Sequence, residues 1–138
     1  MTLQISSLNI CTILVGIISN IIICAFWYSP LLFGNLWLKL IGKKMADISK
    51  AAAIKSMLLG IIPAALSIIF LALVLDFANA TTLTDGLFIG SLVSVGFIGM
   101  NAVNLVLYED RSFMLALLNV GYSFVALNTA AIILVLCK

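Results

Sequence analysis

Four long runs of apolar residues, separated by shorter polar breaks, make up most of the chain. The runs cover residues 8–28, 54–78, 83–108 and 112–137. Each reaches the roughly 20 residues that a helix needs to cross the hydrocarbon of a membrane. Each must be helical, because lipid offers no partner to an unpaired backbone N–H or C=O group. The pattern predicts an all-α protein, an integral membrane four-helix bundle in which residues 1–138 form a single transmembrane domain.

The break between the second and third runs contains only the residues from Asn79 to Thr82. So short a connection leaves the two runs as antiparallel neighbours. Thr82 and Asp85 have the three-residue spacing of a capping box, in which two side chains bond the free N–H groups at a helix start. We therefore expect a tight hairpin between these helices.

The first break, residues 29–53, is the longest connector. Ser29-Pro30 is typical of a helix start, apolar residues follow at helical spacing as far as Leu40, and Gly42 is typical of a helix end. We expect a short interfacial helix between the first and second transmembrane helices. Most of the positive charge lies in or beside this connector, on Lys39, Lys43, Lys44, Lys50 and Lys55.

The distribution of basic residues predicts the orientation in the membrane. Arg111, in the third break, is on the same side as the connector lysines, and only Lys138 is on the other side. Loops rich in Lys and Arg remain in the cytoplasm. We therefore expect the Lys-rich connector to lie inside and both termini to lie outside.

Composition excludes several classes of function. Hydrophobic residues make up 64% of the chain and charged residues 9%, a balance that a soluble domain of this size cannot keep on its surface. The net charge of +2 is too small to indicate nucleic acid as a partner, and membrane lipids are the expected surroundings.

Groups suited to catalysis or metal binding are scarce. The chain has no His, and its three cysteines lie in apolar surroundings without the spacing of metal ligands. The carboxylates lie at or beyond the ends of the runs, at Asp47, Asp76, Asp85, Glu109 and Asp110. We therefore predict no metal site, no cofactor and no catalytic residue, and consider an enzyme the weakest of the functional alternatives.

Each run has one helical face of small and polar residues, which we expect to contact neighbouring helices. In the first run this face holds Thr12, Gly16, Asn20, Cys24 and Trp27, and in the second Ser56, Gly60, Ala64 and Ser67. In the third it holds Gly86, Gly90, Ser94, Phe97, Asn101, Asn104 and Tyr108. In the fourth it holds Ala116, Asn119, Tyr122, Ser123, Ala126 and Ala130, with Asn128 on the opposite face, at an oligomer contact or in solvent.

Three asparagines from three different runs have similar depths. At a rise of about 1.5 Å per residue, Asn20 lies roughly 12 Å from the inner end of its helix, and Asn101 and Asn119 lie about 10 Å from theirs. We hypothesise that the three amides meet in one plane, with Asn104 and Tyr108 below it and Tyr122 above it. Two interpretations remain open: the amides only hold the bundle together, or they line an inward-facing polar pocket or half-channel.

One stretch of the chain resembles a known family. Trp27-Tyr28-Ser29-Pro30-Leu31-Leu32-Phe33-Gly34, followed by Trp37 and Gly42, resembles the small bacterial membrane proteins named only as domain of unknown function 1761. Similar later elements are Asp85-Gly86 with Gly90, Asn104 before Tyr108-Glu109-Asp110-Arg111-Ser112, and Asn119-Val120-Gly121-Tyr122. The resemblance implies a four-helix architecture in the bacterial cytoplasmic membrane, and no reaction or substrate. It touches the region of the asparagines, where Trp27 and Tyr28 are expected to close the inner end of the bundle.

The leading functional hypothesis is a non-enzymatic membrane protein with an inner-leaflet polar cluster. This cluster packs the bundle and binds a small ligand, a lipid or a membrane partner. One alternative is an oligomeric transporter or channel for small solutes, although the first span lacks the acidic residue typical of proton-coupled export. The lowest alternative is an enzyme that acts on a lipid or a quinone. The candidate cluster consists of Asn20, Trp27, Tyr28, Asn101, Asn104, Tyr108, Asn119 and Tyr122.

Overall fold

A computed structural model describes residues 9–137; Leu8 and Lys138, used in the predictions above, lie outside this part. Its elements are α1 (Ile10–Trp27), α2 (Gly34–Leu40), η2 (Met45–Asp47), α3 (Lys50–Phe77), α4 (Leu83–Ser91), η3 (Leu92–Gly99), α5 (Met100–Glu109) and α6 (Phe113–Leu136). Because α4, η3 and α5 run on without a break, the described residues contain four helices long and apolar enough to cross a membrane. The predicted all-α four-helix membrane architecture is confirmed.

The hairpin between α3 and α4 is as tight as its sequence predicts. The Thr82 hydroxyl accepts from the Asp85 N–H at 3.2 Å, and the Asp85 carboxylate accepts from the Thr82 N–H at 2.9 Å, which completes the capping box. At the end of α3, Asn79 adopts the left-handed conformation (φ 52°). The Ala80 N–H then reaches back to the Leu75 carbonyl at 2.9 Å, which is the bond that closes a Schellman motif.

The connector contains the expected short helix, but this helix begins at Gly34 rather than at Ser29-Pro30. Ser29 instead forms a turn: its hydroxyl donates to the Phe26 carbonyl at 2.7 Å, and its own carbonyl accepts from the Gly34 N–H at 2.9 Å. A side chain at position 34 would collide with the backbone carbonyl of Tyr28. The Trp-Tyr-Ser-Pro element is therefore a compact turn that leaves the membrane helix, and glycine is required at its end.

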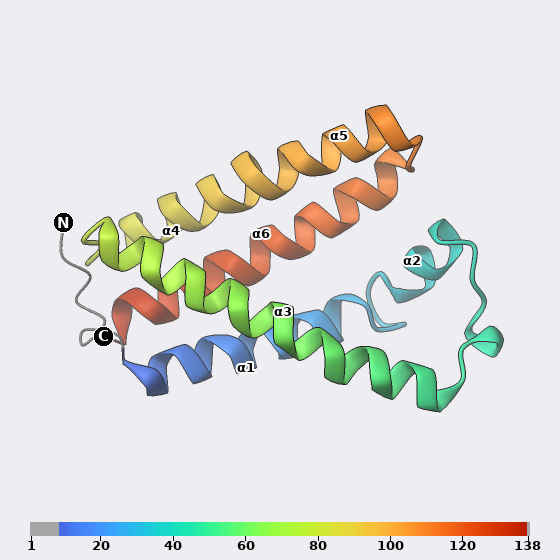
Figure 1. The fold of residues 1–138 in the computed structure, drawn as a ribbon, viewed down its shortest axis with the longest axis horizontal. Helices are drawn as coiled ribbons and strands as arrows, with labels where there is room; N and C mark the ends of the chain where they lie inside the picture. Colours follow the sequence, from blue (N-terminus) through green and yellow to red (C-terminus); the bar gives the residue numbers. More distant parts are fainter. Residues whose placement is uncertain (1–8, 138) are drawn as a thin grey trace.

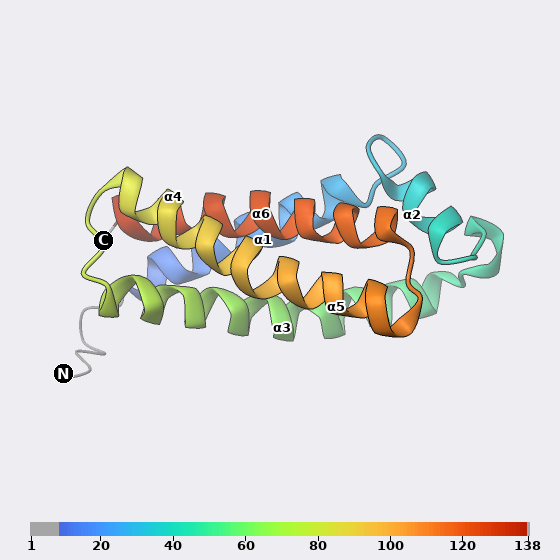
Figure 2. The ribbon, with the colours of Figure 1, turned by 90° about the horizontal axis from the view of Figure 1, so that it is seen from above.

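Helix α6 occupies the centre of the bundle. It contacts α1, α2, α3, α4, η3 and α5, and Figures 1 and 2 show it between the other long helices. The termini side of the bundle, at the left of Figure 1, is closed by the short α3–α4 hairpin. Toward the connector, at the right of Figure 1, α3 and α5 diverge from each other.

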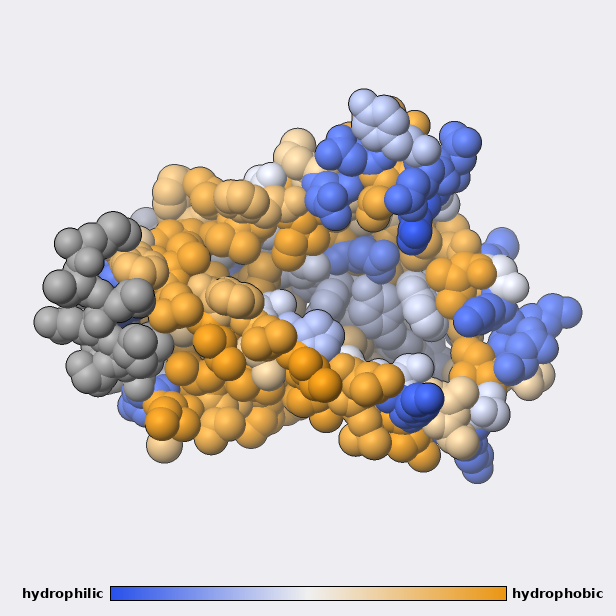
Figure 3. Space-filling view, in the orientation of Figure 1, coloured by the Kyte–Doolittle hydropathy of each residue, from blue (hydrophilic) through white to orange (hydrophobic). Residues whose placement is uncertain are grey.

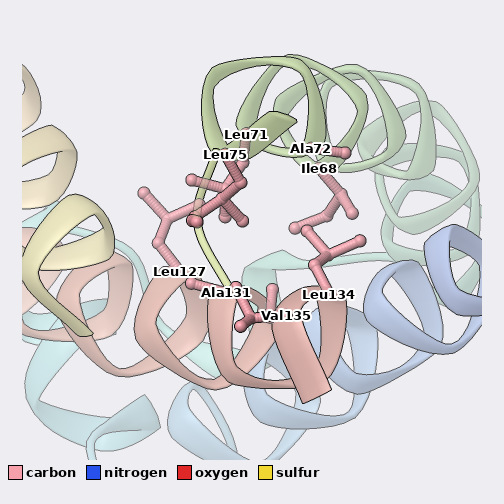
Figure 4. Packing of buried hydrophobic residues seen from close by; sticks show 10 residues of the cluster. Ile68, Leu71, Ala72, Leu75, Leu127, Ala131, Leu134 and Val135 are labelled. Carbon is pink, nitrogen blue, oxygen red and sulfur yellow. The ribbon is translucent and has the colours of Figure 1, made fainter. Parts of the chain in front are cut away.

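The apolar core lies in the half of the bundle near the termini. Leucine, isoleucine and valine side chains of α3 and α6 interdigitate there (Figure 4), and Ile68 is completely buried. The buried cluster consists of Ile68, Leu71, Ala72, Leu75, Ala80, Leu127, Ala130, Ala131, Leu134 and Val135. Small residues let α1 and α4 approach this core closely, as Gly16 does against Ile68 and Gly86 against Ala131.

The small-residue face predicted for the second span does not make the helix contacts, which is a correction. Ser56, Gly60 and Ser67 are exposed and Ala64 is only half-buried. The buried positions of α3 are Ile68, Leu71, Ala72 and Leu75. The reason is that α3 packs on α6 in the half near the hairpin, through large apolar side chains, while its half near the connector diverges from the bundle. Within α3, no residue before Ile68 is buried.

The third span contains a π-helical segment, η3, between α4 and α5. A π-helix closes its hydrogen bonds from i to i+5 rather than i+4, so each of its turns takes an additional residue. The face predicted at a constant 100° per residue is correct as far as Gly86, Gly90 and Ser94, which are buried. Beyond that point it is wrong, because Phe97 is 68% exposed and the residues that follow are rotated with it.

We expect Gly90→Ala to destabilise the bundle by about 1–3 kcal/mol, because a methyl group there overpacks the α4–α6 contact. Its Cβ would lie 2.9 Å from Asn128 Oδ1 and 3.1 Å from the Asn128 Cα. Gly96→Ala is the matched control in the same span, because a Cβ there meets nothing within 4 Å. Unfolding free energies measured by steric trapping in lipid micelles test this, and equal stabilities of the two variants would contradict the packing described.

Candidate functional site

Two tyrosine–asparagine hydrogen bonds join α1 to α6 inside the bundle. The Tyr122 hydroxyl donates to Asn20 Oδ1 at 2.5 Å, and the Tyr28 hydroxyl donates to Asn119 Oδ1 at 2.8 Å. The two tyrosine rings lie against each other, with centroids 5.5 Å apart. We call these four residues, Asn20, Tyr28, Asn119 and Tyr122, the tyrosine–asparagine cluster.

The helices themselves place the cluster. Asn119 and Tyr122 are three residues apart on α6 and therefore share one face of that helix. Asn20 is buried on the facing side of α1, and Tyr28 is the residue directly after the end of α1. The cluster thus connects α1 to α6 at two places: within α1 at Asn20, and at the C-terminal end of α1 at Tyr28. In hydrocarbon, such paired polar groups avoid the cost of an unsatisfied amide.

Further aromatic side chains lie around the end of the cluster that contains Tyr28. Trp27 packs on Phe33 with ring centroids 4.7 Å apart, and its ring lies close to Gly121 of α6. Trp37 of α2 meets the Tyr28 ring edge-on at 5.6 Å. Trp27 Nε1 is buried and has no hydrogen-bond partner among the described residues. These contacts attach α2 and the turn before it to the bundle.

A pocket of about 170 Å³ lies between α5 and α6, in the half of the bundle near the connector. Its polar lining residues are Asn101, Asn119 and Arg111, and the rest of its lining is apolar. The apolar lining consists of Ile98, Ala102, Leu105, Leu115, Ala116 and Val120. Asn119 therefore belongs both to the tyrosine–asparagine cluster and to this α5–α6 pocket.

The structure does not bring all the predicted residues together. The three amides do not meet in one plane. Asn20 and Asn119 each accept a hydrogen bond from a tyrosine, and the two tyrosine rings are in contact. Asn101 instead lines the α5–α6 pocket together with Asn119. Asn104 and Tyr108 were expected inside the bundle, below the plane of the asparagines, but both are exposed on α5, and Tyr108 is 85% exposed. The π-helical turn of η3 is the reason, because it rotates α5 away from the face predicted from α4.

Asn128 is also placed differently from the sequence expectation of an outward-facing residue. It is only 6% exposed, lies against Gly90 of α4, accepts from the Ser91 hydroxyl at 3.2 Å and donates to the Phe124 carbonyl at 2.8 Å. The correction follows from the central position of α6, which buries two of its faces instead of one. Asn128 therefore connects α6 to α4 through a hydrogen bond inside the bundle.

Sequence reasoning missed two further contributions to the site. From the sequence, Arg111 was used only to predict the orientation in the membrane; the residue pairs with Glu109 at 2.9 Å on the surface and also lines the α5–α6 pocket. Trp37 was named only in the resemblance to the family, and its packing against Tyr28 was not predicted. The signal for Arg111 was its position one helical turn before Leu115, at the start of α6.

The side chains of the site are suited to hydrogen bonding. Amides and phenols both donate and accept hydrogen bonds, and no carboxylate or imidazole takes part in the cluster or the pocket lining. Within residues 9–137, no three His, Cys, Asp or Glu side chains are grouped so as to hold a metal ion. The arrangement is suited to orienting a polar group in apolar surroundings.

The fold and this site define a multi-pass integral membrane protein, a four-helix bundle with a hydrogen-bonded polar centre. A family model described as protein of unknown function (DUF1761) matches residues 11–135. The chain belongs to this family, as the Trp-Tyr-Ser-Pro element indicated. Comparisons with curated proteins and with solved structures each found no match.

We expect Tyr122→Phe to destabilise the bundle by about 1–2 kcal/mol, because it leaves the buried Asn20 carbonyl oxygen without its donor. Tyr108→Phe removes the same hydroxyl from an exposed position and serves as the matched control. A double-mutant cycle with Asn20→Leu, read out as unfolding free energy in lipid micelles, measures the coupling. Strictly additive effects of Tyr122→Phe and Asn20→Leu would show that the bond contributes nothing.

Proposed function

We propose that the protein is a non-enzymatic membrane protein that binds a small amphipathic ligand, or the polar end of a lipid, in the α5–α6 pocket. The observation that supports this most directly is the lining of the pocket: two asparagines and an arginine within an otherwise apolar wall. Ligand sites are typically concave and apolar, with a few convergent polar groups that fix orientation. This pocket follows that pattern.

The state of Asn101 supports a bound partner. Its side chain is exposed in a membrane-spanning helix, and no hydrogen bond from its amide to another described residue is present. Moving an amide from water into hydrocarbon without a hydrogen-bond partner costs on the order of several kcal/mol of free energy. A ligand with a hydroxyl, carbonyl or amide group would pair with Asn101 and Asn119 together.

The size and position of the pocket limit the ligand. About 170 Å³ corresponds to roughly six water molecules at about 30 Å³ each, which is room for a small polar head or for the end of a longer molecule. Arg111 lies at the inner end of α6, where it favours an acidic or strongly polar group. We infer an elongated ligand that pairs one polar group with Asn101 and Asn119 and a second, acidic or strongly polar group with Arg111. Its apolar part lies along Leu105 and Leu115, between these two groups.

Asn101→Leu tests this function against the matched variant Asn104→Leu, which removes an exposed amide one turn further along α5 and outside the pocket. We expect Asn101→Leu to lower retention of the co-purifying ligand by about tenfold, as the loss of one or two hydrogen bonds predicts. Asn104→Leu should retain it. The measurement is native mass spectrometry of the intact protein released gently from its own membrane.

Two outcomes would contradict the proposal. One is that the wild-type protein carries no defined small molecule or lipid beyond bulk membrane composition. The other is that both Asn variants lose a bound molecule equally, which would place the molecule on the exposed face of α5 in general. Circular dichroism and thermal unfolding of both variants establish that each is folded.

An oligomeric transporter or channel is the second candidate function. The inner half of α3 is uncovered within one chain, and a Cβ at Gly60 would meet nothing within 4 Å, so another helix can approach there. The exposed Asn104 offers a self-complementary amide for such a contact. The same native mass measurement decides this alternative: a symmetric homo-oligomer favours it, a foreign subunit indicates a docking role, and a monomer opposes both.

We further propose that the protein lies in the bacterial cytoplasmic membrane with the connector inside and both termini outside. The support is the concentration of Lys residues between α1 and α3. Replacing the three native cysteines with serine and then introducing Lys44→Cys should give a protein that a membrane-impermeant maleimide does not label in intact cells. Thr81→Cys, in the opposite hairpin, should be labelled, and the reverse pattern would invert the orientation.

A further inference from the structure

A second hollow lies in the connector, outside the transmembrane helices and separate from the α5–α6 pocket. It has a volume of about 500 Å³ and is lined by Asn35, Leu38, Lys39, Gly42, Lys43, Lys44 and Met45. Three of its seven lining residues are lysines, and Asn35 adds an amide. The hollow is formed by α2 and by the chain that leaves it toward η2.

The fold of the connector brings these lysines together. Gly42 adopts a left-handed conformation (φ 71°), and the Lys43 N–H reaches back to the Leu38 carbonyl at 3.0 Å while the Gly42 N–H bonds the Lys39 carbonyl at 3.2 Å. This pair of bonds is a Schellman motif. It reverses the chain immediately after α2, so Lys43 and Lys44 flank the same hollow as Lys39.

The position of α2 is fixed from the inside of the bundle. Leu38 is 8% exposed, and Trp37 packs edge-on against Tyr28, which in turn donates to Asn119 of α6. Lys39 therefore extends from an anchored helix, and Lys43 and Lys44 follow the turn that is hydrogen-bonded to the end of that helix. A binding site on α2 is held at a defined place relative to the ends of α1 and α6.

The positive charge of the hollow is not neutralised by the chain. Asp47 is the single carboxylate between residues 29 and 55, and its Oδ2 accepts from the Lys44 backbone N–H at 3.1 Å. Arg111 and Glu109 form an ion pair, and neither residue lines the hollow. Figure 3 shows hydrophilic residues gathered at the connector end of the molecule, beside a hydrophobic surface over the middle of the bundle.

We infer that this connector hollow binds the phosphate-bearing headgroup of an anionic phospholipid. The converging lysines supply the charge that a phosphate needs, and basic pockets at the membrane surface favour anionic headgroups. Leu38 and Met45, in the same lining, provide apolar contact for the glycerol and the first methylene groups of a lipid. A free inorganic anion has no such apolar part, so these two residues favour the lipid. The location between two transmembrane helices, α1 and α3, keeps the hollow at the depth of the headgroups.

This inference is independent of the proposed function, because it concerns a different site. The test compares two variants that each remove two positive charges from the same part of the chain. In the K43Q/K44Q variant both charges come from the lining of the hollow. In the K50Q/K55Q variant both come from the start of α3, outside that lining.

The full-length protein is placed in nanodiscs of phosphatidylcholine with a minor fraction of phosphatidylglycerol, and retained lipids are counted by native mass spectrometry after gentle release. We expect K43Q/K44Q to lower the affinity for phosphatidylglycerol by about tenfold to thirtyfold, from the energy of a lysine near an anionic surface. K50Q/K55Q should lower it by less than about threefold, because its charges act only at longer range.

Equal losses in the two variants would overturn the inference, because they indicate general attraction to the membrane rather than a site. Wild-type affinity in K43Q/K44Q would overturn it too. A third arm adds inorganic phosphate to protein in phosphatidylcholine alone, and binding there with the same sensitivity to K43Q/K44Q would assign the hollow to a free anion. Circular dichroism of each variant verifies that α2 and the bundle remain folded.

Discussion

The structure depends on one constraint: within hydrocarbon, polar groups find no partner except other groups of the protein. The chain meets this constraint around α6, which contacts every long helix. Near the termini the solution is close packing, with glycines of α1 and α4 against the apolar core and Asn128 bonded to Ser91. Near the connector the solution is the pair of phenol–amide bonds to Asn20 and Asn119.

These two solutions divide the bundle into halves with different properties. The half near the termini is dense and holds the apolar core. In the half near the connector α3 and α5 separate from the centre, polar side chains replace apolar ones, and the α5–α6 pocket opens beside Asn119. A densely packed half that carries an open half would give a stable frame for the proposed binding region, because the frame does not need the ligand to hold its helices together.

Much of the fold followed from the sequence, since run length and the Thr82 capping box are local signals. The site was less accessible. Helical periodicity correctly places Asn119 and Tyr122 on one face, but it assumes a constant turn angle, and the π-helical residues Leu92–Gly99 have no distinctive sequence signal. Nor does periodicity within one helix state that α6 is central, which is why the burial of Asn128 and the exposure of Gly60 were not foreseen.

The π-helical segment also affects how members of this family should be compared with one another. A relative that lacks one residue in that segment can form an ordinary α-helix there, because the π-helical turn takes up the additional residue. An asparagine aligned with Asn101 across such a gap would then keep the same neighbour. A relative of equal length that is α-helical throughout would instead turn its later residues by about 100° around the helix axis, so a residue match beyond Gly99 implies equivalent surroundings only where the π-helical segment is shared or its additional residue is absent.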